Sequence, residues 1–284
     1  MTDFVMSHEV PIRLGFFFGI LILMAGWELL APRRPLSRSK AVRWGNNLAI
    51  VFFNSALLRL TFPIVAVGMA ALAAERGWGL LNNYALPGWL AVAAAVAALD
   101  LAIYLQHVMV HAVPVFWRLH RMHHTDPDFD VTTGLRFHPL EILLSMGIKL
   151  AVVALLGPPP VAVLIFEVAL NGTALFNHGN VRLPAPLDRI LRLVVVTPDM
   201  HRVHHSILPS EANSNFGFNI SWWDRLFLTY RAQPREGHLG MTIGTAGFGE
   251  PRGLWLDRLL WQPLLKGEGG YAINRREFDD PAER

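Results

Sequence analysis

Long apolar runs separated by short polar segments dominate the first 176 residues of the chain. Three runs, at about residues 14–31, 48–73 and 89–105, approach or exceed the roughly 20 residues that a helix needs to cross a hydrocarbon core. Two shorter runs follow at about 142–156 and 161–176, divided by a Gly-Pro-Pro-Pro sequence that favours a tight hairpin crossing the membrane partly or fully. The pattern predicts an all-α protein with several membrane-spanning helices.

Basic residues gather between the first and second apolar runs, at Arg33, Arg34, Arg38, Lys40 and Arg43. An excess of Lys and Arg beside membrane spans is typical of cytoplasmic segments. Counting spans from there brings residues 107–138, and the chain after the hairpin, to the cytoplasmic side as well. We therefore expect a cytoplasmic, histidine-rich helical cap. Because basic residues follow the first apolar run, that run does not resemble a cleavable signal peptide.

The composition agrees with a membrane protein and excludes several kinds of chemistry. Hydrophobic residues make up 52% of the 284 residues, mean hydropathy is +0.34, and 17% of residues are charged, against about a quarter in soluble domains. The absence of cysteine excludes disulfides, cysteine-ligated iron–sulfur clusters and a cysteine nucleophile. The net charge of +3, without a basic block, gives no reason to expect a nucleic-acid partner.

Nine histidines form a pattern that predicts metal binding. In the order H-x-x-x-H, H-x-x-H-H, a single histidine and a second H-x-x-H-H, they are His107 and His111; His120, His123 and His124; His178; and His201, His204 and His205. Residues three and four apart share a helix face, so each box is expected to present its rings to one place. Neutral imidazole is the commonest metal-binding side chain. The eight imidazoles of the three boxes are too many for one ion, which predicts two ions and hence a reaction.

The alternative, that these are ordinary histidines that bind no metal, becomes weaker each time the motif is repeated. A lone H-x-x-x-H is more often formed by ordinary histidines, and His8 and His238 lie outside the pattern. Two ions sharing eight or nine imidazoles suit a redox metal used with O₂, with iron the first choice, although imidazole ligands also accommodate zinc and copper. A metal transporter or membrane metal-binding protein is the alternative class. Transport would need polar ligands through the spans, whereas these histidines gather on one side.

Several motifs around the boxes resemble one known family. They are Asp100-x-x-x-Tyr104, Trp117-Arg118-Leu119-His120, the RFHPLE sequence 136–141, the TPDMH sequence 197–201, and NFGF at 215–218 with WWDRLF at 222–227. Over about residues 95–232 the chain resembles the sterol desaturase and fatty acid hydroxylase superfamily of membrane di-iron enzymes. Eight residues separate His111 from His120. Membrane acyl desaturases separate these boxes by tens of residues, which favours the hydroxylase and sterol desaturase side.

The resemblance implies an oxidoreductase that uses two iron ions and O₂ to hydroxylate or desaturate a C–H bond of a lipid taken from the bilayer. All nine histidines of the pattern would be ligands, with no catalytic residue separate from them. Sterol, fatty acyl, carotenoid and ether lipids stay open as substrates, and so do the two reactions, because both begin with hydrogen abstraction. Electrons are expected from a separate donor of the ferredoxin or cytochrome b5 type with its reductase, since no fused carrier domain is apparent.

Four further residues are expected either to bind the metals or to orient the histidines that do, namely Asp100, His138, Asn177 and Asp199. Asp100 lies seven residues before His107, on the same helix face, and acids within a membrane span are usually functional. The chain departs from the family pattern at Val108, where many relatives have Arg, and at Leu228, where Gly is usual. Some lipid hydroxylases also have a histidine pair where this chain has His178 alone, which leaves the ligand number there open.

Three regions are expected: an N-terminal transmembrane region at 1–88, a catalytic domain like the fatty acid hydroxylases and sterol desaturases at 89–232, and a C-terminal amphipathic segment with a polar tail at 233–284. Lys149 and Glu167 lie about nine residues before and after the hairpin turn. Because this places them at a similar depth, the sequence predicts an ion pair between them inside the bilayer.

Overall fold

The computed structural model describes residues 2–266. Its helices are α1 Thr2–Ser7, α2 Glu9–Leu30, α3 Lys40–Thr61, α4 Ala66–Arg76, α5 Leu80–Asn83, α6 Gly88–Ala112, α7 Pro114–His124, α8 Pro139–Leu156, α9 Pro160–Asn177, α10 Ala185–Leu191, α11 Pro198–His204, α12 Pro209–Ala212, α13 Trp222–Leu226, α14 Gly237–Gly240 and α15 Leu256–Trp261. Three 3-10 turns are η1 Thr133–Leu135, η2 Pro251–Leu254 and η3 Gln262–Leu264. Over 2–266 the chain forms isolated β-bridges but no strand, which confirms the all-α class.

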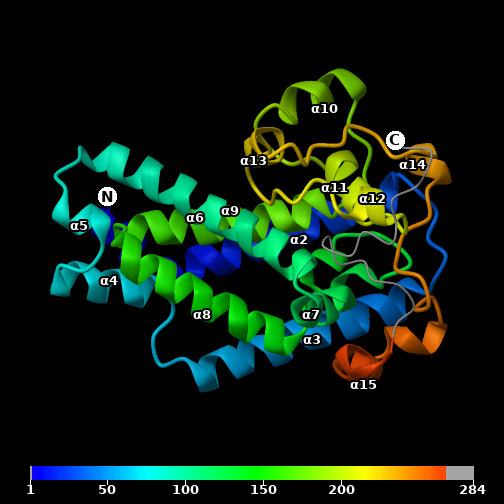
Figure 1. Ribbon diagram of the computed structural model, residues 1–284, viewed down its shortest axis with the longest axis horizontal. Helices are drawn as coiled ribbons and strands as arrows, with labels where there is room; N and C mark the ends of the chain where they lie inside the picture. The colour runs from blue at the N-terminus through cyan, green and yellow to red at the C-terminus, as the bar shows by residue number, and fades with distance from the viewer. Residues whose placement is uncertain (1, 267–284) are drawn as a thin grey trace.

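Five helical segments are long and apolar enough to cross a membrane: α2, the α3–α5 segment, α6, α8 and α9. They pack against one another along their lengths, as Figure 1 shows. The hairpin helices α8 and α9 have 18 residues each, or about 27 Å of helix, close to the roughly 30 Å of a hydrocarbon core. The prediction of a multi-span integral membrane protein is confirmed.

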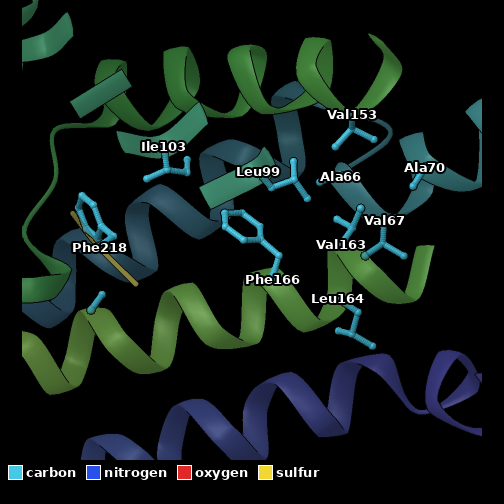
Figure 2. Close-up of a cluster of buried hydrophobic side chains, with 11 residues drawn as sticks. Ala66, Val67, Ala70, Leu99, Ile103, Val153, Val163, Leu164, Phe166 and Phe218 are labelled. Carbon is cyan, nitrogen blue, oxygen red and sulfur yellow. The ribbon is translucent and has the colours of Figure 1, made fainter. Parts of the chain in front are cut away.

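The spans meet in an apolar cluster formed by α4, α6, α8 and α9. In Figure 2, Leu99 of α6, Phe166 of α9 and Val153 of α8 converge on it. The α4 helix contributes Ala66 and Ala70, both fully buried. Small side chains let helix backbones approach closely, and close packing is the main force between helices in a bilayer. The cluster therefore fixes α6 and α9, which carry histidines at their other ends.

The second apolar run is two helices, whereas the sequence pattern suggested one. The α3 helix ends at Thr61 and α4 begins at Ala66, with Pro63 in the irregular link between them. Proline lacks an amide hydrogen and disfavours helical backbone at the preceding residue, so the chain leaves the helix before it. Hydropathy alone does not register such a break, because the linking residues are themselves apolar.

The predicted ion pair inside the membrane region is confirmed. The Lys149 ammonium of α8 lies 2.8 Å from the Glu167 carboxylate of α9. Arg13 of α2 also binds Glu167, so three spans share one buried carboxylate. Removing either cation would leave Glu167 less compensated in a medium of low dielectric constant, which explains why the charges occur together.

The short helices α11, α12, α14 and α15 gather at one end of the bundle, on the right of Figure 1, whereas α5 lies at the opposite end. The α6 span ends at Ala112, and Pro114 starts α7, as its ring favours the first position of a helix. In the predicted C-terminal amphipathic segment, Leu259 of α15 packs against Ile50 of α3 and Met122 of α7. The polar tail beyond residue 266 lies outside the described residues.

Candidate metal centre

The ends of four helices carry the nine histidines of the sequence pattern. His107 and His111 occupy the last two turns of α6, and the second box forms the end of α7. His178 is the residue that caps the C-terminus of α9. The third box lies on α11 and its C-cap, after Pro198 at the first helical position. All nine side chains are at most 2% exposed, so the surrounding helices exclude bulk water from them.

The structure brings these histidines together as two adjoining groups. The five-histidine group consists of His107, His111, His120, His124 and His204, and the four-histidine group consists of His123, His178, His201 and His205. Within each group, one ring nitrogen per residue lies within 4.8 Å of those of all the others. The groups touch where the rings of His124 and His205 stack with centroids 4.6 Å apart. Each group could hold one metal ion, which agrees with the prediction of two.

Each H-x-x-H-H box serves both groups, whereas the sequence pattern suggested that a box serves one place. Successive helical residues point about 100° apart, so positions i and i+4 share a face more closely than i and i+3. In α7, His120 and His124 accordingly belong to the five-histidine group and His123 to the other. In α11 the first and last histidines of the box enter the four-histidine group, and the middle one enters the five-histidine group.

Hydrogen bonds fix which nitrogens of the five-histidine group carry protons. The His107 Nδ1–H donates to the Phe216 carbonyl at 2.7 Å, and the His204 Nδ1–H donates to the Ser214 carbonyl at 2.8 Å. In the neutral ring, each Nε2 is then a bare acceptor. These two Nε2 atoms lie 3.0 Å apart. Two lone pairs cannot hydrogen bond to each other, whereas a cation between them satisfies both, so the donor set fits a metal ion.

The four-histidine group repeats this arrangement with fewer supports. The His178 Nδ1–H donates to the Ala174 carbonyl at 2.7 Å, which leaves Nε2 as the acceptor. That Nε2 lies 3.0 Å from Nε2 of His201 and 3.1 Å from Nε2 of His123. Both ring nitrogens of His205 are buried without a hydrogen-bond partner among the described residues. Buried polar atoms normally have partners, and a metal ion would supply one here.

Burial keeps the rings outside the membrane spans neutral. It lowers the pKa of His123, His124, His201, His204 and His205 well below the usual value, and neighbouring imidazoles lower it further. Burial also lowers the pKa of His178 to about 3. Neutral imidazole is the form that binds metals, so at neutral pH these rings need not lose a proton first.

Two side chains that orient histidines carried no assigned role in the sequence pattern. The Glu141 carboxylate accepts from His120 Nδ1 at 2.7 Å, and the Asn213 side-chain oxygen lies 3.2 Å from His111 Nδ1. Carboxylate partners of this kind fix the tautomer and raise the basicity of a ligand histidine. Both act on the five-histidine group. Glu141 stood within a family-like motif, but only the fold reveals which histidine it faces.

Two charged residues of the first spans hold the loops behind the histidines. Glu28 of α2 accepts from the backbone amides of Val131 and Asn180, each at 2.7 Å. Buried Arg43 of α3 binds both carboxylate oxygens of Asp126 at 2.8 Å. The sequence feature that could have identified Glu28 and Arg43 is their charge within or beside an apolar helix, because such a charge is costly unless it is paired.

His138 and Asn177 support the site from outside the two histidine groups. His138 caps α8, because its Nδ1 accepts from the Leu140 amide at 3.2 Å. Its place at a helix terminus, where amides lack intrahelical acceptors, explains why it does not turn toward the other rings. The Asn177 amide donates to the Phe218 carbonyl at 3.0 Å, and the Phe218 ring lies against that of His107.

Asp100 and Asp199 likewise bind partners other than histidine rings of the two groups. Asp100 accepts from the indole of Trp223 at 2.8 Å, so it anchors the 215–230 segment to α6. Asp199 pairs with Arg202 on α11 and with Arg33, whose guanidinium is 3.3 Å away. Neither acid belongs to the two histidine groups, and their expected role beside the metals stays a prediction. Both lie near histidines in sequence, but the Trp223 indole binds one oxygen of Asp100, and Arg33 and Arg202 bind Asp199.

The departure at Leu228 has a backbone explanation. Leu228 has φ of +60°, in the left-handed region where a Cβ atom is strained and glycine is free. Asn215, at the start of the same segment, has φ of +53°, which asparagine tolerates better than most residues. A glycine before Thr229 would relieve strain, which accounts for the usual family residue.

The described helices and the two buried histidine groups define a class: a helical membrane protein with adjoining sites suited to metal ions. Residues 92–229, just under half of the chain, match the model of the fatty acid hydroxylase family, so this part of the chain is similar to that family. The match starts within α6, after the first spans. It ends at residue 229, beyond the Ser214 and Phe216 carbonyls that accept hydrogen bonds from His204 and His107. It contains both histidine groups complete.

Three relatives illustrate the range of chemistry in the family. The chain is 32% identical to the ornithine lipid hydroxylase OlsE of Rhizobium tropici, over 48% of this chain and 40% of the relative. It is 30% identical to human alkylglycerol monooxygenase, over 52% and 32% of the two chains. It is 25% identical to the Delta(7)-sterol 5(6)-desaturase erg3B of Aspergillus fumigatus, over 77% and 64%.

The aligned region therefore covers well under two thirds of the first two relatives. No solved structure shows a significant match to this chain.

Proposed function

We propose that this chain is a membrane-bound oxidoreductase that uses two iron ions and O₂ to hydroxylate or desaturate a C–H bond of a lipid. The observation that carries the proposal is the pair of adjoining, buried histidine groups at the end of a bundle of candidate membrane spans. The printed activities of the relatives, on ornithine lipid, alkylglycerol and sterol, support a lipid as the substrate.

The nine histidines would hold the ions, five at one position and four at the other. Iron bound there would supply the redox chemistry that allows O₂ to oxidise an unreactive C–H bond. The protein itself would position the rings, keep them neutral and exclude water. Carbonyl acceptors hold the rings in one tautomer, burial keeps them neutral, and the surrounding helices exclude water. A substrate held at this end of the spans would come directly from the bilayer.

The histidine end of the bundle would face the cytoplasm, since Arg33, Arg34 and Arg38 lie at that end and basic segments beside spans favour the cytoplasmic side. A separate ferredoxin or cytochrome b5 type protein with its reductase would supply the electrons there. Residues 89–232 would form the catalytic domain, with 1–88 as a transmembrane region and 233–284 as a C-terminal segment.

Transport of metal is the less favoured alternative. A transporter needs ligands along the path across the membrane, whereas both histidine groups lie at one end of the spans. Within the hairpin helices, the charged side chains Lys149 and Glu167 are paired with each other. Zinc or copper could occupy imidazole sites, so the metal has to be measured.

Lipid profiling of cells with and without the protein tests the proposal, with His123→Ala as the inactive variant and His8→Ala as the matched control. His8 is an exposed histidine outside both groups. We expect a lipid gaining one oxygen or losing two hydrogens in cells with the wild-type or His8→Ala protein, and not with His123→Ala. Purified wild-type protein should contain about two irons per chain, one for each group. A product that persists in His123→Ala, or iron-free protein that moves metal across vesicles, would overturn it.

A further inference from the structure

A lobe built from two short helices projects from the side of the bundle near its histidine end, at the top of Figure 1. We call residues 182–194 and 220–228, which contain α10 and α13, the α10/α13 lobe. Its two parts are joined, because the Trp222 indole donates to the Leu193 carbonyl at 2.6 Å and the Ser221 hydroxyl donates to the Arg192 carbonyl at 2.8 Å. These hydrogen bonds hold the two parts of the lobe together.

The outer surface of the lobe is apolar. The α10 part exposes Leu187, Ile190, Leu193 and Val194. The α13 part exposes Trp222, Leu226, Phe227 and Leu228. Ile190 and Leu226 are each 65% exposed and Leu228 is 92% exposed. Large apolar patches are rare on surfaces that face water, and they usually mark a protein or membrane contact.

The attachment of the lobe sets its depth relative to the membrane. Asp100 of α6 accepts from the Trp223 indole at 2.8 Å and from the Ile220 amide at 3.2 Å. The Phe227 ring stacks on Tyr104 of the same span at 5.3 Å. Asp100 precedes His107 by seven residues, which is about 10 Å along a helix. The α13 part is thus fixed to the membrane span itself, nearer to its middle than the histidine boxes are.

The charges around the patch are basic. Arg182, Arg189 and Arg225 are the exposed ionisable residues of the lobe, all within the part of the chain that the structure describes. Its two acids face inward: Asp188 pairs with Arg192, and Asp224 is fully buried, where it accepts from backbone amides. An apolar surface bordered by arginine is typical of segments that lie in the interface of anionic membranes.

We propose that the α10/α13 lobe is a membrane-binding surface, which inserts its apolar residues into the boundary between headgroups and acyl chains and holds anionic headgroups with its arginines. The bilayer that surrounds α6 is the occupant, because the lobe is anchored to this span at the level of Asp100 and Tyr104. Insertion would reach about 5–10 Å below the headgroups, as for other interfacial helices.

Single-cysteine variants test this directly, since the chain contains no cysteine. Ile190→Cys and Leu226→Cys are labelled with a nitroxide in vesicles of phosphatidylcholine, with and without phosphatidylglycerol. Collision rates with O₂, which enters the bilayer, and with a water-soluble nickel chelate report depth. Phe52→Cys, on a 70% exposed position of the α3 span, is the deep control, and Glu250→Cys, on an exposed loop, is the aqueous control.

We expect both lobe labels to fall between the two controls and to lie deeper when phosphatidylglycerol is present. Adding Arg189→Glu to the Ile190→Cys variant should remove the dependence on phosphatidylglycerol. Nickel access equal to that of the Glu250→Cys control would overturn the proposal. So would spin–spin broadening that disappears when unlabelled chains are mixed in, because a second copy of the chain would then cover the patch. Each variant is first matched to wild type in its thermal unfolding midpoint, so that misfolding is not read as exposure.

Discussion

The two histidine groups differ in what holds their rings. In the five-histidine group, partners come from side chains and from backbone: Glu141 for His120, Asn213 for His111, and two carbonyls of the 214–216 segment. In the four-histidine group the Ala174 carbonyl holds His178, while Nδ1 of His123 and of His201 is buried without a partner among the described residues.

Aromatic rings contact both groups, but in the four-histidine group they are the main support for rings whose Nδ1 lacks a hydrogen bond. The Phe137 ring stacks on His123 at 4.5 Å, and Phe129 lies against His178 at 5.5 Å and His205 at 5.0 Å. Hydrogen bonds fix both the tautomer and the direction of a lone pair, whereas packing fixes mainly the plane of the ring. The five-histidine group is therefore better organised in advance, and we expect it to hold its metal ion more tightly.

The largest effect should come from losing a histidine of either group, and the neighbouring residues His201 and His204 allow a matched test. Both His201→Ala and His204→Ala should reduce product formation by more than about 100-fold, because loss even of an outer partner of a ligand costs 10–100-fold. Chelator dialysis followed by metal analysis then separates the groups. His201→Ala, which keeps the five-histidine group complete, should retain the remaining ion longer. Equal retention would contradict the comparison.

Acid should destabilise the metal-free protein by the next largest amount. The folded protein holds His178 and its neighbours neutral with lowered pKa values, while the unfolded chain protonates them near pH 6.5. The unfolded state then binds more protons below pH 6.5, so stability is full above that pH and falls as the pH drops toward 3. Each such histidine contributes up to about 1.4 kcal/mol per pH unit.

Thermal unfolding of the metal-free protein between pH 8 and pH 5 measures this effect. His178→Gln removes one titrating ring from the four-histidine group and should flatten the acid side of the profile by up to about 1.4 kcal/mol per pH unit. A wild-type unfolding midpoint that stays constant between pH 7.5 and pH 5 would show that the rings are not held neutral.

Glu141→Gln should weaken metal binding at the five-histidine group specifically. Glutamine keeps the shape of the side chain but removes the negative charge that supports His120, which typically costs 10–100-fold in metal affinity. Chelator competition should show one of two ions released more easily, while the other is unchanged. Glu250→Gln, at an exposed position, is the control. If both ions weaken together, the two groups do not bind independently.

The smallest effect concerns the segment that supports the five-histidine group. Leu228→Gly removes the Cβ strain of a left-handed residue and should stabilise the protein by about 1 kcal/mol in detergent. Leu228→Ala is the matched control, because it deletes the exposed side chain but keeps the Cβ atom. A gain of the same size in both variants would assign the effect to the lost apolar surface instead of the backbone.

Much of this site could be predicted from the sequence, because its signals are local. The apolar runs located the spans, the histidine spacing identified all nine residues of the two groups, and the positions of Lys149 and Glu167 about the hairpin predicted their ion pair. Each inference needed only the geometry of one helix or one hairpin. The break near Pro63 was missed because hydropathy does not distinguish a continuous apolar helix from two joined ones.

The remaining features depend on contacts between distant segments. The helix geometry of the box separates His123 from His120 and His124, but which other histidines each face meets follows from where α9 and α11 approach α7, which the spacing does not encode. Asp100 shares a face with His107, but the indole of Trp223, more than a hundred residues later, takes its oxygen. His138 resembled a ligand by its neighbours, yet its position at the start of α8 makes it a cap.

The division of each H-x-x-H-H box between the two groups has a mechanical consequence. The separation between the groups is set by adjacent residues of one rigid helix, with the rings of His123 and His124 centred 5.3 Å apart. A loop could drift and change that separation, but a helix cannot do so without unwinding. One residue inserted ahead of His123 would turn both rings by about 100° and misdirect both groups at once. The rigid α7 helix thus keeps the two histidine groups at a constant separation while the lipid around them moves.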